Sequence, residues 1–115
     1  MNPNEIHVTP IARQIEAVIE AIKVEGKRSI GLVEKEAEAI WEYKKAIAGQ
    51  ILRRKAEGLP VTLIKGVVDG DVADEERRKN LAVGGLKAHW ERLRLLQGQQ
   101  NGFQSMFRHL ESTSK

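Results

Sequence analysis

The fold depends on the stretch GLPVTLIKGVVDGD, residues 58–71, whose composition differs from that of both flanks. It is rich in β-branched residues and glycine, whereas the segments around it are rich in glutamate, lysine and alanine. Three interpretations compete: a strand, a ligand-binding loop and a corner between helices. A strand needs a second strand to pair its backbone groups, and the rest of the sequence offers no candidate. We therefore reject the strand.

Local signals within the same stretch predict a corner. Pro60 restricts the residue before it to extended geometry and cannot continue a preceding helix. Thr62 can cap one helical turn over residues 63–68, which Gly70 ends, and Asp71 can then cap the next helix. We expect three apolar side chains of this turn to pack against the ends of both long helices: Leu63, Ile64 and Val67.

The segment before the corner predicts two helices, over about residues 10–25 and 30–57. Pro10 follows a threonine N-cap and suits the first helical position, and Gly26 is a suitable stop. Ser29 can cap the second helix. The positions of one face recur at spacings of three and four along both segments: Ile11, Ile15, Val18 and Ile22, then Val33, Ala37, Ile40, Lys44, Ile47 and Ile51.

The segment after the corner predicts a long helix over about residues 71–97 and a short one over about 103–111. Acidic residues open the long helix, where the helix dipole favours negative charge. Gly84 and Gly85 predict a kink or a close helix contact. The glycines of residues 98–102 separate the short helix. The inward stripe comprises Ala82, Leu86, His89, Leu93, Leu96, Gln100, Phe103, Phe107 and Leu110.

Together these elements predict an all-α fold in a single domain, residues 1–115. A long antiparallel hairpin of the 30–57 and 71–97 helices forms its frame, and the 10–25 helix packs alongside. The hairpin helices are longer than a compact domain of this size needs, which favours a homodimer.

A corner at residues 58–70 would place position i of one hairpin helix beside about position 128 − i of the other. The charges then match across the hairpin. Arg53, Arg54 and Lys55 face Asp74, Glu75 and Glu76, while Glu34, Glu36, Glu38 and Glu42 face Arg94, Arg92, Trp90 and Lys87.

Several chemistries are disfavoured. The chain has no cysteine, which excludes disulfides, thiolate nucleophiles and zinc knuckles. The three histidines lack metal-ligand spacing, and we expect His89 to be a hydrogen-bonded core or interface residue. Residues 66–70 lack the signature of a phosphate loop, and no carboxylate pair is predicted to flank a cleft. We expect no enzyme, no catalytic residues, no metal and no cofactor.

The sequence also bears on location. No apolar run is long enough to span a bilayer, and the N-terminus lacks the pattern of a signal peptide. We expect a cytoplasmic protein with no membrane partner, in the host cytoplasm if the protein is viral.

The C-terminal third is basic. Residues 77–110 carry seven lysines and arginines against one acid, Glu91. Arginines interspersed with aromatic residues can hold phosphates and stack on bases. The candidates for nucleic-acid contact are Arg77, Arg78, Lys79, Arg92, Arg94 and Arg108. The candidates for contact with a partner protein are Trp41, Trp90, Phe103 and Phe107, all of which could instead be core residues.

Residues 55–70, KAEGLPVTLIKGVVDG, precede an acidic and then basic helix start and a long C-terminal helix. This arrangement resembles small helical proteins of bacterial viruses that carry a similar Gly-hydrophobic-Pro-Val-Thr-Leu-Ile corner. The resemblance covers about residues 50–110. It implies an accessory protein, linked in some members to viral DNA replication or recombination, and it carries over no catalytic residues.

Two functions therefore stay open. The first is a non-enzymatic accessory protein of DNA metabolism that contacts nucleic acid or a nucleic-acid-handling protein. The second is a protein-binding module, such as an inhibitor of a host enzyme or defence system, or a structural coiled-coil adaptor.

Overall fold

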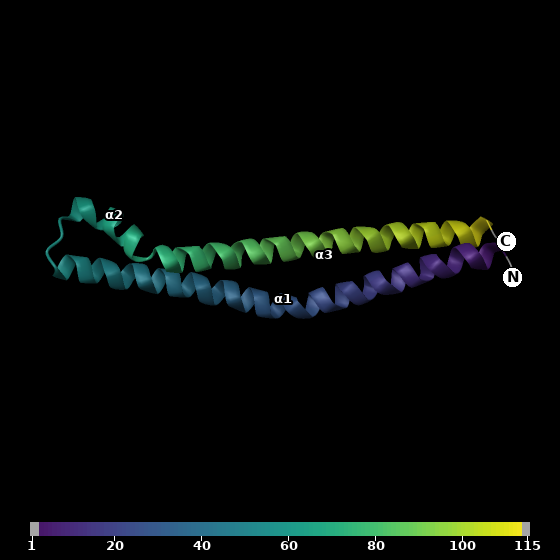
Figure 1. Ribbon diagram of the computed structural model, residues 1–115, viewed down its shortest axis with the longest axis horizontal. Helices are drawn as coiled ribbons and strands as arrows, with labels where there is room; N and C mark the ends of the chain where they lie inside the picture. The colour runs from purple at the N-terminus through teal and green to yellow at the C-terminus, as the bar shows by residue number, and fades with distance from the viewer. Residues whose placement is uncertain (1–2, 114–115) are drawn as a thin grey trace. The chain divides into compact units, whose positions relative to one another are not determined.

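The computed structural model describes the backbone of residues 3–113 and the side chains of residues 10–113. It contains three helices: α1 (Pro3–Ala56), α2 (Val61–Asp71) and α3 (Ala73–Thr113), which Figure 1 labels. No strand occurs in residues 3–113, which confirms the all-α fold and the rejection of a strand in the corner.

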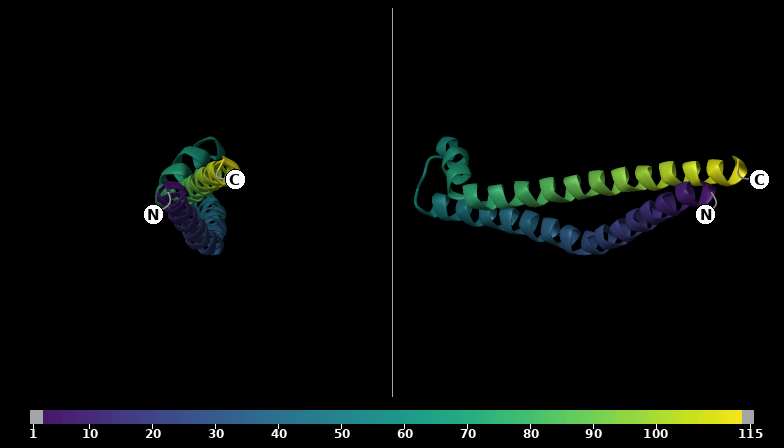
Figure 2. Two further views of the ribbon diagram at one scale, coloured as in Figure 1. Left: turned by 90° about the vertical axis from the view of Figure 1, so that its right-hand side faces the viewer. Right: turned by 45° about the vertical axis from the view of Figure 1, so that its right-hand side comes forward.

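Two compact units divide the chain. The corner unit is Ile30–Lys87, and the terminal unit combines Met1–Ser29 with Ala88–Lys115. α1 and α3 each contribute a segment to both units. Within each unit these segments lie side by side and run in opposite directions, as Figures 1 and 2 show. The predicted antiparallel hairpin is therefore confirmed.

α1 is a single helix of 54 residues, so the predicted break between residues 25 and 30 is wrong. Gly26 keeps a helical backbone, because glycine inside a helix costs only about 1 kcal/mol relative to alanine. Ser29 does not cap a new helix; its hydroxyl oxygen lies 3.4 Å from the carbonyl oxygen of Glu25, one turn earlier. Pro10 lies inside α1, where it removes one backbone hydrogen bond without ending the helix. The predicted N-terminal helix is thus the first part of α1.

α1 ends where the sequence predicts, at a glycine in the left-handed conformation. Gly58 has a φ of 82°, which glycine adopts without strain. Its N–H donates to the carbonyl of Lys55 over 3.0 Å, and the N–H of Leu59 donates to the carbonyl of Arg54 over 3.1 Å. These two bonds form a Schellman motif, which satisfies the last carbonyls of the helix and turns the chain back.

α2 is a helix of 11 residues and not the single turn that the sequence predicts. Pro60 precedes it, and its φ of −56° suits a helix start without a side-chain cap. Thr62 lies inside α2, so its predicted capping role is wrong. Gly70 also lies inside, and the helix continues to Asp71, which therefore does not open α3. Val72 is the C-cap residue between α2 and α3.

α2 packs against the end of α1 and forms the core of the corner unit. Ile64, Val68 and Val72, each one turn apart, are buried. Leu63 is exposed and Val67 is half-buried, so Ile64 alone of the three predicted core residues is buried. The buried cluster packs against half-buried side chains of α1 and of the turn: Tyr43, Ala46, Ile47, Ile51 and Leu59.

α3 runs without interruption from Ala73 to Thr113, so the predicted short C-terminal helix is the last part of α3. The glycines of residues 98–102 keep helical backbone geometry. A Cβ atom added at Gly84 or Gly85 would meet no atom within 4 Å, so the close helix contact predicted there does not occur. Interior glycines lower the stability of α3 but do not end it.

The predicted pairing register is wrong because the turn is shorter than predicted. The chain reverses at residues 57–60, and α2 then runs back along α1. In the terminal unit, position i of α1 faces about position 117 − i of α3. One pair that carries this assignment is Arg92 and Glu25, whose Nη1 and Oε1 atoms are 3.5 Å apart.

The predicted charge pairs do not form. Arg54 donates from Nη2 to Oδ1 of Asp71 over 2.6 Å, so it meets the end of α2 and not the acidic start of α3. Arg92 meets Glu25, although the predicted register placed it beside Glu36. Within the described part of the chain, no ion pair joins α3 to the acidic residues of the 34–42 segment: Glu34, Glu36, Glu38 and Glu42.

Candidate functional site

A buried polar cluster joins α1 and α3 in the terminal unit. His89 of α3 is 5% exposed, its Nδ1 lies 3.1 Å from Oε2 of Glu25, and its Nε2 lies 2.7 Å from Oγ of Ser29. When Nδ1 donates to the carboxylate, the neutral Nε2 accepts the hydroxyl proton of Ser29. The prediction of a hydrogen-bonded inward histidine is confirmed. Sequence reasoning misses its two partners, although their four-residue spacing places both on one face of a helix.

Glu25 is the charged centre of this cluster. Besides His89, the guanidinium groups of Arg28 and Arg92 approach it to 3.4 and 3.5 Å. A carboxylate this buried needs such partners, because an unpaired buried charge costs several kcal/mol. Glu25 can meet His89 and Arg92 in one register of α1 against α3, so the cluster specifies how the two segments of the terminal unit pair.

Ser29, His89 and Glu25 follow the same atom order as the triad of a serine hydrolase. Acyl transfer also needs free donors beside the nucleophile to hold the oxyanion. Ser29 lies in the interior of α1, where backbone N–H groups donate to carbonyls one turn back. The geometry therefore fits a cluster that sets how α1 and α3 pair better than it fits a catalytic site.

A groove of about 510 Å³ lies between α1 and α3 in the corner unit. Half of its lining residues are apolar or glycine, and they come from both helices: Leu32, Ala39, Leu81, Ala82 and Gly85. Charged residues complete it: Lys35, Glu38, Glu42, Glu75 and Arg78. The Oε2 atom of Glu75 is buried and has no hydrogen-bond partner among the described residues, whereas its Oε1 lies 3.8 Å from Arg78. The groove thus combines apolar side chains with the ion pair between Glu75 and Arg78.

The six nucleic-acid candidates divide between the two units. Three of them contact groups within the protein: Arg78 pairs with Glu75, Arg92 pairs with Glu25, and the Lys79 ammonium lies 4.3 Å from the centre of the Tyr43 ring. The other three are exposed and form no ion pair with the described residues. They are Arg77 in the corner unit, and Arg94 and Arg108 in the terminal unit.

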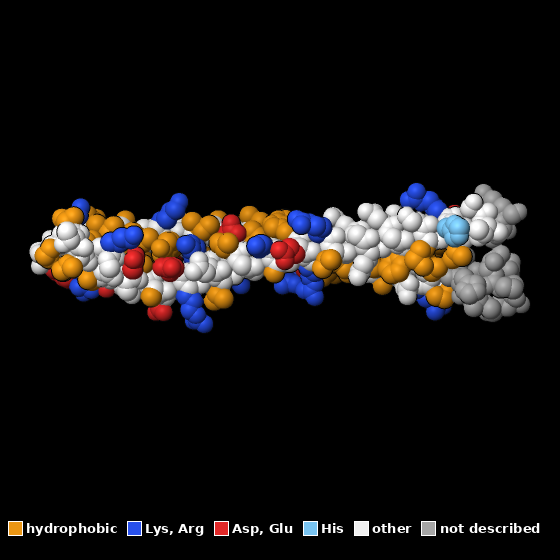
Figure 3. All heavy atoms as spheres, turned by 90° about the horizontal axis from the view of Figure 1, so that it is seen from above, with side chains coloured by type: hydrophobic (Ala, Val, Ile, Leu, Met, Phe, Trp, Pro, Cys, Tyr) orange, Lys and Arg blue, Asp and Glu red, His pale blue; other side chains and the backbone are white. Residues whose placement is uncertain are grey.

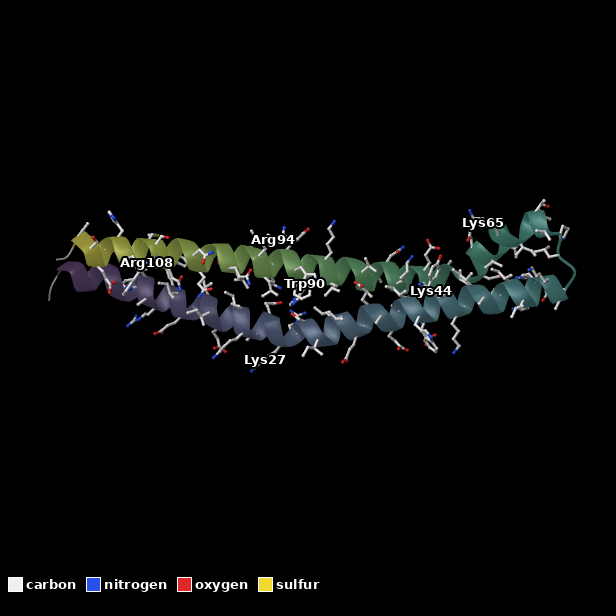
Figure 4. All side chains as sticks on the ribbon, turned by 180° about the vertical axis from the view of Figure 1, so that it is seen from behind. Lys27, Lys44, Lys65, Trp90, Arg94 and Arg108 are labelled. Atoms are coloured by element: carbon white, nitrogen blue, oxygen red, sulfur yellow. The ribbon has the colours of Figure 1, made fainter. Side chains whose placement is uncertain are left out.

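The four aromatic candidates also divide between the units. Trp41 of the corner unit is 54% exposed, and the Lys45 ammonium lies 4.7 Å from its ring centre. Trp90 of the terminal unit is 44% exposed and contacts the His89 ring at a centroid distance of 5.2 Å. Figure 4 shows Trp90 and Arg94 on the same helix, with the Arg94 side chain directed away from α1. Phe103 and Phe107 are half-buried.

No group of His, Asp and Glu side chains in residues 10–113 is placed to hold a metal ion. The helices of residues 3–113 do not combine the length and hydrophobicity needed to cross a membrane. Comparisons with protein families, with curated proteins and with solved structures found no match to this chain. The resemblance to small phage proteins therefore stays a prediction.

Proposed function

We propose that the protein is a non-enzymatic helical module that binds another protein through apolar side chains exposed along its helices. One observation carries this proposal. Among the side chains that the structure describes, five hydrophobic ones are buried, whereas thirteen large hydrophobic ones are exposed. Figure 3 shows such side chains at the surface between charged ones on one face of the molecule.

This exposure follows from pairing two helices. Two helices can bury only the stripe along which they touch, so apolar residues outside that stripe stay in water. Leu81 and Trp41 are examples at 63% and 54% exposure. Covering a large apolar side chain is worth roughly 1.5 to 3 kcal/mol when burial is complete. Several such residues on one patch are the usual signature of a protein-binding surface.

Nucleic-acid binding is the second candidate. It is favoured by Arg77, Arg94 and Arg108, which are exposed and free of ion pairs with the described residues. A phosphate-binding surface usually gathers several free cations on one face, whereas Arg78, Lys79 and Arg92 contact groups within the protein. The apolar exposure therefore ranks above the basic residues as evidence of function.

Capture of a partner from a nuclease-treated bacterial lysate tests the first function. We expect the immobilised protein to retain a protein partner after nucleic acid is destroyed. Trp41→Ser should weaken this capture, because it removes a large exposed apolar group. Glu20→Gln is the matched control at an exposed position of the same helix and should leave capture unchanged. Two results would count against the proposal. One is that no protein is retained. The other is that Trp41→Ser, and serine substitutions at other exposed apolar positions, reduce capture no more than Glu20→Gln does.

A salt titration tests the second function. Direct binding predicts DNA affinity that falls steeply with salt concentration, by about 0.9 in the logarithmic slope for each phosphate contact. Replacing Arg94 by glutamine should then lower that slope by about 1. Absence of binding at low salt would remove this candidate and leave the first untouched.

A further inference from the structure

We propose that a second copy of this chain packs on the outer face of α1 in the corner unit, with the two α1 helices antiparallel. The inference rests on the proposed protein-binding function and names one partner for it. Six exposed positions of α1, at alternating spacings of four and three, form a stripe that we call the outer seam: Ile30, Glu34, Ala37, Trp41, Lys44 and Ala48. This spacing is the heptad pattern of a coiled-coil contact.

The outer seam is separate from the stripe of α1 that faces α2 and α3. That inner stripe has the same spacing, begins two residues later and is half-buried throughout: Leu32, Glu36, Ala39, Tyr43, Ala46 and Gln50. Each residue turns an α-helix by about 100°, so a shift of two residues places the two stripes on nearly opposite sides of α1. The contacts of α1 within the corner unit therefore leave the outer seam open to a partner.

The apolar residues of the outer seam complement one another in size. A two-fold axis across α1 brings position i of one copy beside position 78 − i of the other. Ala37 then meets Trp41, and Ile30 meets Ala48, so each large side chain packs on a small one. Ile30 is 70% exposed, and Trp41 is 54% exposed even with the Lys45 ammonium over its ring. A second copy would thus cover apolar surface that the single chain leaves in water.

The two charges of the outer seam select the same arrangement. With position i beside position 78 − i, Glu34 of each copy meets Lys44 of the other. Both side chains are exposed, and neither forms an ion pair with the described residues. A parallel pair would place Lys44 against Lys44 and Glu34 against Glu34, which opposes association, and a shift by one heptad would separate Glu34 from Lys44. Charged residues at seam positions therefore specify both the antiparallel direction and the register.

Sedimentation velocity over a range of protein concentrations tests the charge pairing. We expect the wild-type chain to dimerise and Lys44→Glu to raise the dissociation constant about tenfold or more, which corresponds to 1.4 kcal/mol. The double variant Glu34→Lys/Lys44→Glu should regain at least part of the affinity. Lys65→Glu is the matched control, because it makes the same charge change at an exposed position of α2 in the same unit (Figure 4). Helical circular dichroism verifies that each variant is folded.

Disulfide cross-linking tests the antiparallel direction independently of the charges. The chain has no cysteine, so an introduced thiol reports only on its own position. A mixture of Ile30→Cys and Ala48→Cys chains should form a disulfide between the two variants under mild oxidation, because the proposed register places these positions side by side. Ile30→Cys alone should cross-link poorly, since the antiparallel pair separates its two thiols by 18 residues of helix, or about 27 Å.

Three results would overturn this inference: a monomer at every concentration, equal dissociation constants for the Lys44→Glu and Lys65→Glu variants, or cross-linking of Ile30→Cys alone that matches the mixture. A monomer that still captures a different protein from a lysate would end the inference and leave the proposed function standing. A dimer that Lys44→Glu weakens and that captures no other protein would support the inference and count against any partner other than this chain.

Discussion

Gly58 illustrates how one backbone angle determines where α1 ends. Its φ of 82° lies in the left-handed region, where a Cβ atom costs about 1 to 2 kcal/mol. We expect Gly58→Ala to lower the free energy of unfolding by about 1 kcal/mol. Gly66→Ala is the matched control, since Gly66 lies inside α2 and an added Cβ meets nothing within 4 Å. Urea unfolding at one protein concentration compares them, and equal midpoints would contradict the assigned conformation.

Asp71 makes the stability of the corner unit depend on pH. Two hydrogen bonds from Arg54, of 2.8 and 2.6 Å, hold the pKa of the Asp71 carboxyl below its ordinary value. A folded-state pKa below the unfolded one contributes stability above the unfolded pKa, and this stability is lost as pH falls through the folded value. The pKa of Glu57 is lowered in the same direction by hydrogen bonds from Arg53 and Arg54.

We therefore expect the wild-type chain to lose thermal stability between neutral and acidic pH. Asp71→Asn removes part of this dependence, because the amide does not titrate and Glu57 still does. Thermal unfolding followed by circular dichroism at several pH values measures the difference. A pH profile of Asp71→Asn identical to that of the wild type would show that the ion pair with Arg54 has no role in acid sensitivity.

At the scale of the element, the main feature is the continuity of α1. Gly26 has no neighbouring atom within 4 Å of an added Cβ and has helical geometry, so Gly26→Ala should stabilise the protein by up to about 1 kcal/mol. A left-handed helix stop at this position would give the opposite sign. Chemical unfolding measures the change, and destabilisation by Gly26→Ala would restore the broken helix that the sequence predicts.

The stop signals at Gly26 and at residues 98–102 mislead for one physical reason. Helix propensity is a weak preference of about 1 kcal/mol per glycine, and packing of the apolar stripes on either side outweighs it. The glycine at position 58 differs, because Pro60 follows it and the turn requires a left-handed residue. The sequence therefore predicts the true end of α1 correctly and adds two ends that do not exist.

The basic candidates within a single turn of α3 also show where prediction from sequence fails. Arg77, Arg78 and Lys79 are adjacent in sequence but point about 100° apart around the helix. Arg77 is therefore exposed, Arg78 reaches the groove and Lys79 covers the Tyr43 ring. Closeness in sequence predicts a basic patch, whereas helical geometry distributes the three charges among three environments.

At the scale of the whole molecule, the pairing of α1 with α3 is the property to test. Ser29→Ala leaves Nε2 of buried His89 without a partner, which costs about 1 to 3 kcal/mol. Ser112→Ala, at an exposed position of α3, is the matched control. Amide hydrogen exchange should show lost protection in the terminal unit for Ser29→Ala alone. Equal exchange in both variants would mean that the cluster does not hold the segments in register.

The sequence by itself determined the helical class, the end of α1 at Gly58 and the inward orientation of His89. These depend on local properties: apolar spacing, the fixed φ of proline and the left-handed preference of glycine. The pairing register and the partners of the charges were decided only by the tertiary structure. The predicted and observed registers differ by about 11 residues, which is close to three helical turns, so α3 presents the same apolar face in both. On α1, Val33, Ala37 and Lys44 of the predicted face are exposed. Periodicity along α3 cannot distinguish the two registers, and the docking of α2 on α1 and the burial of Glu25 against His89 select one.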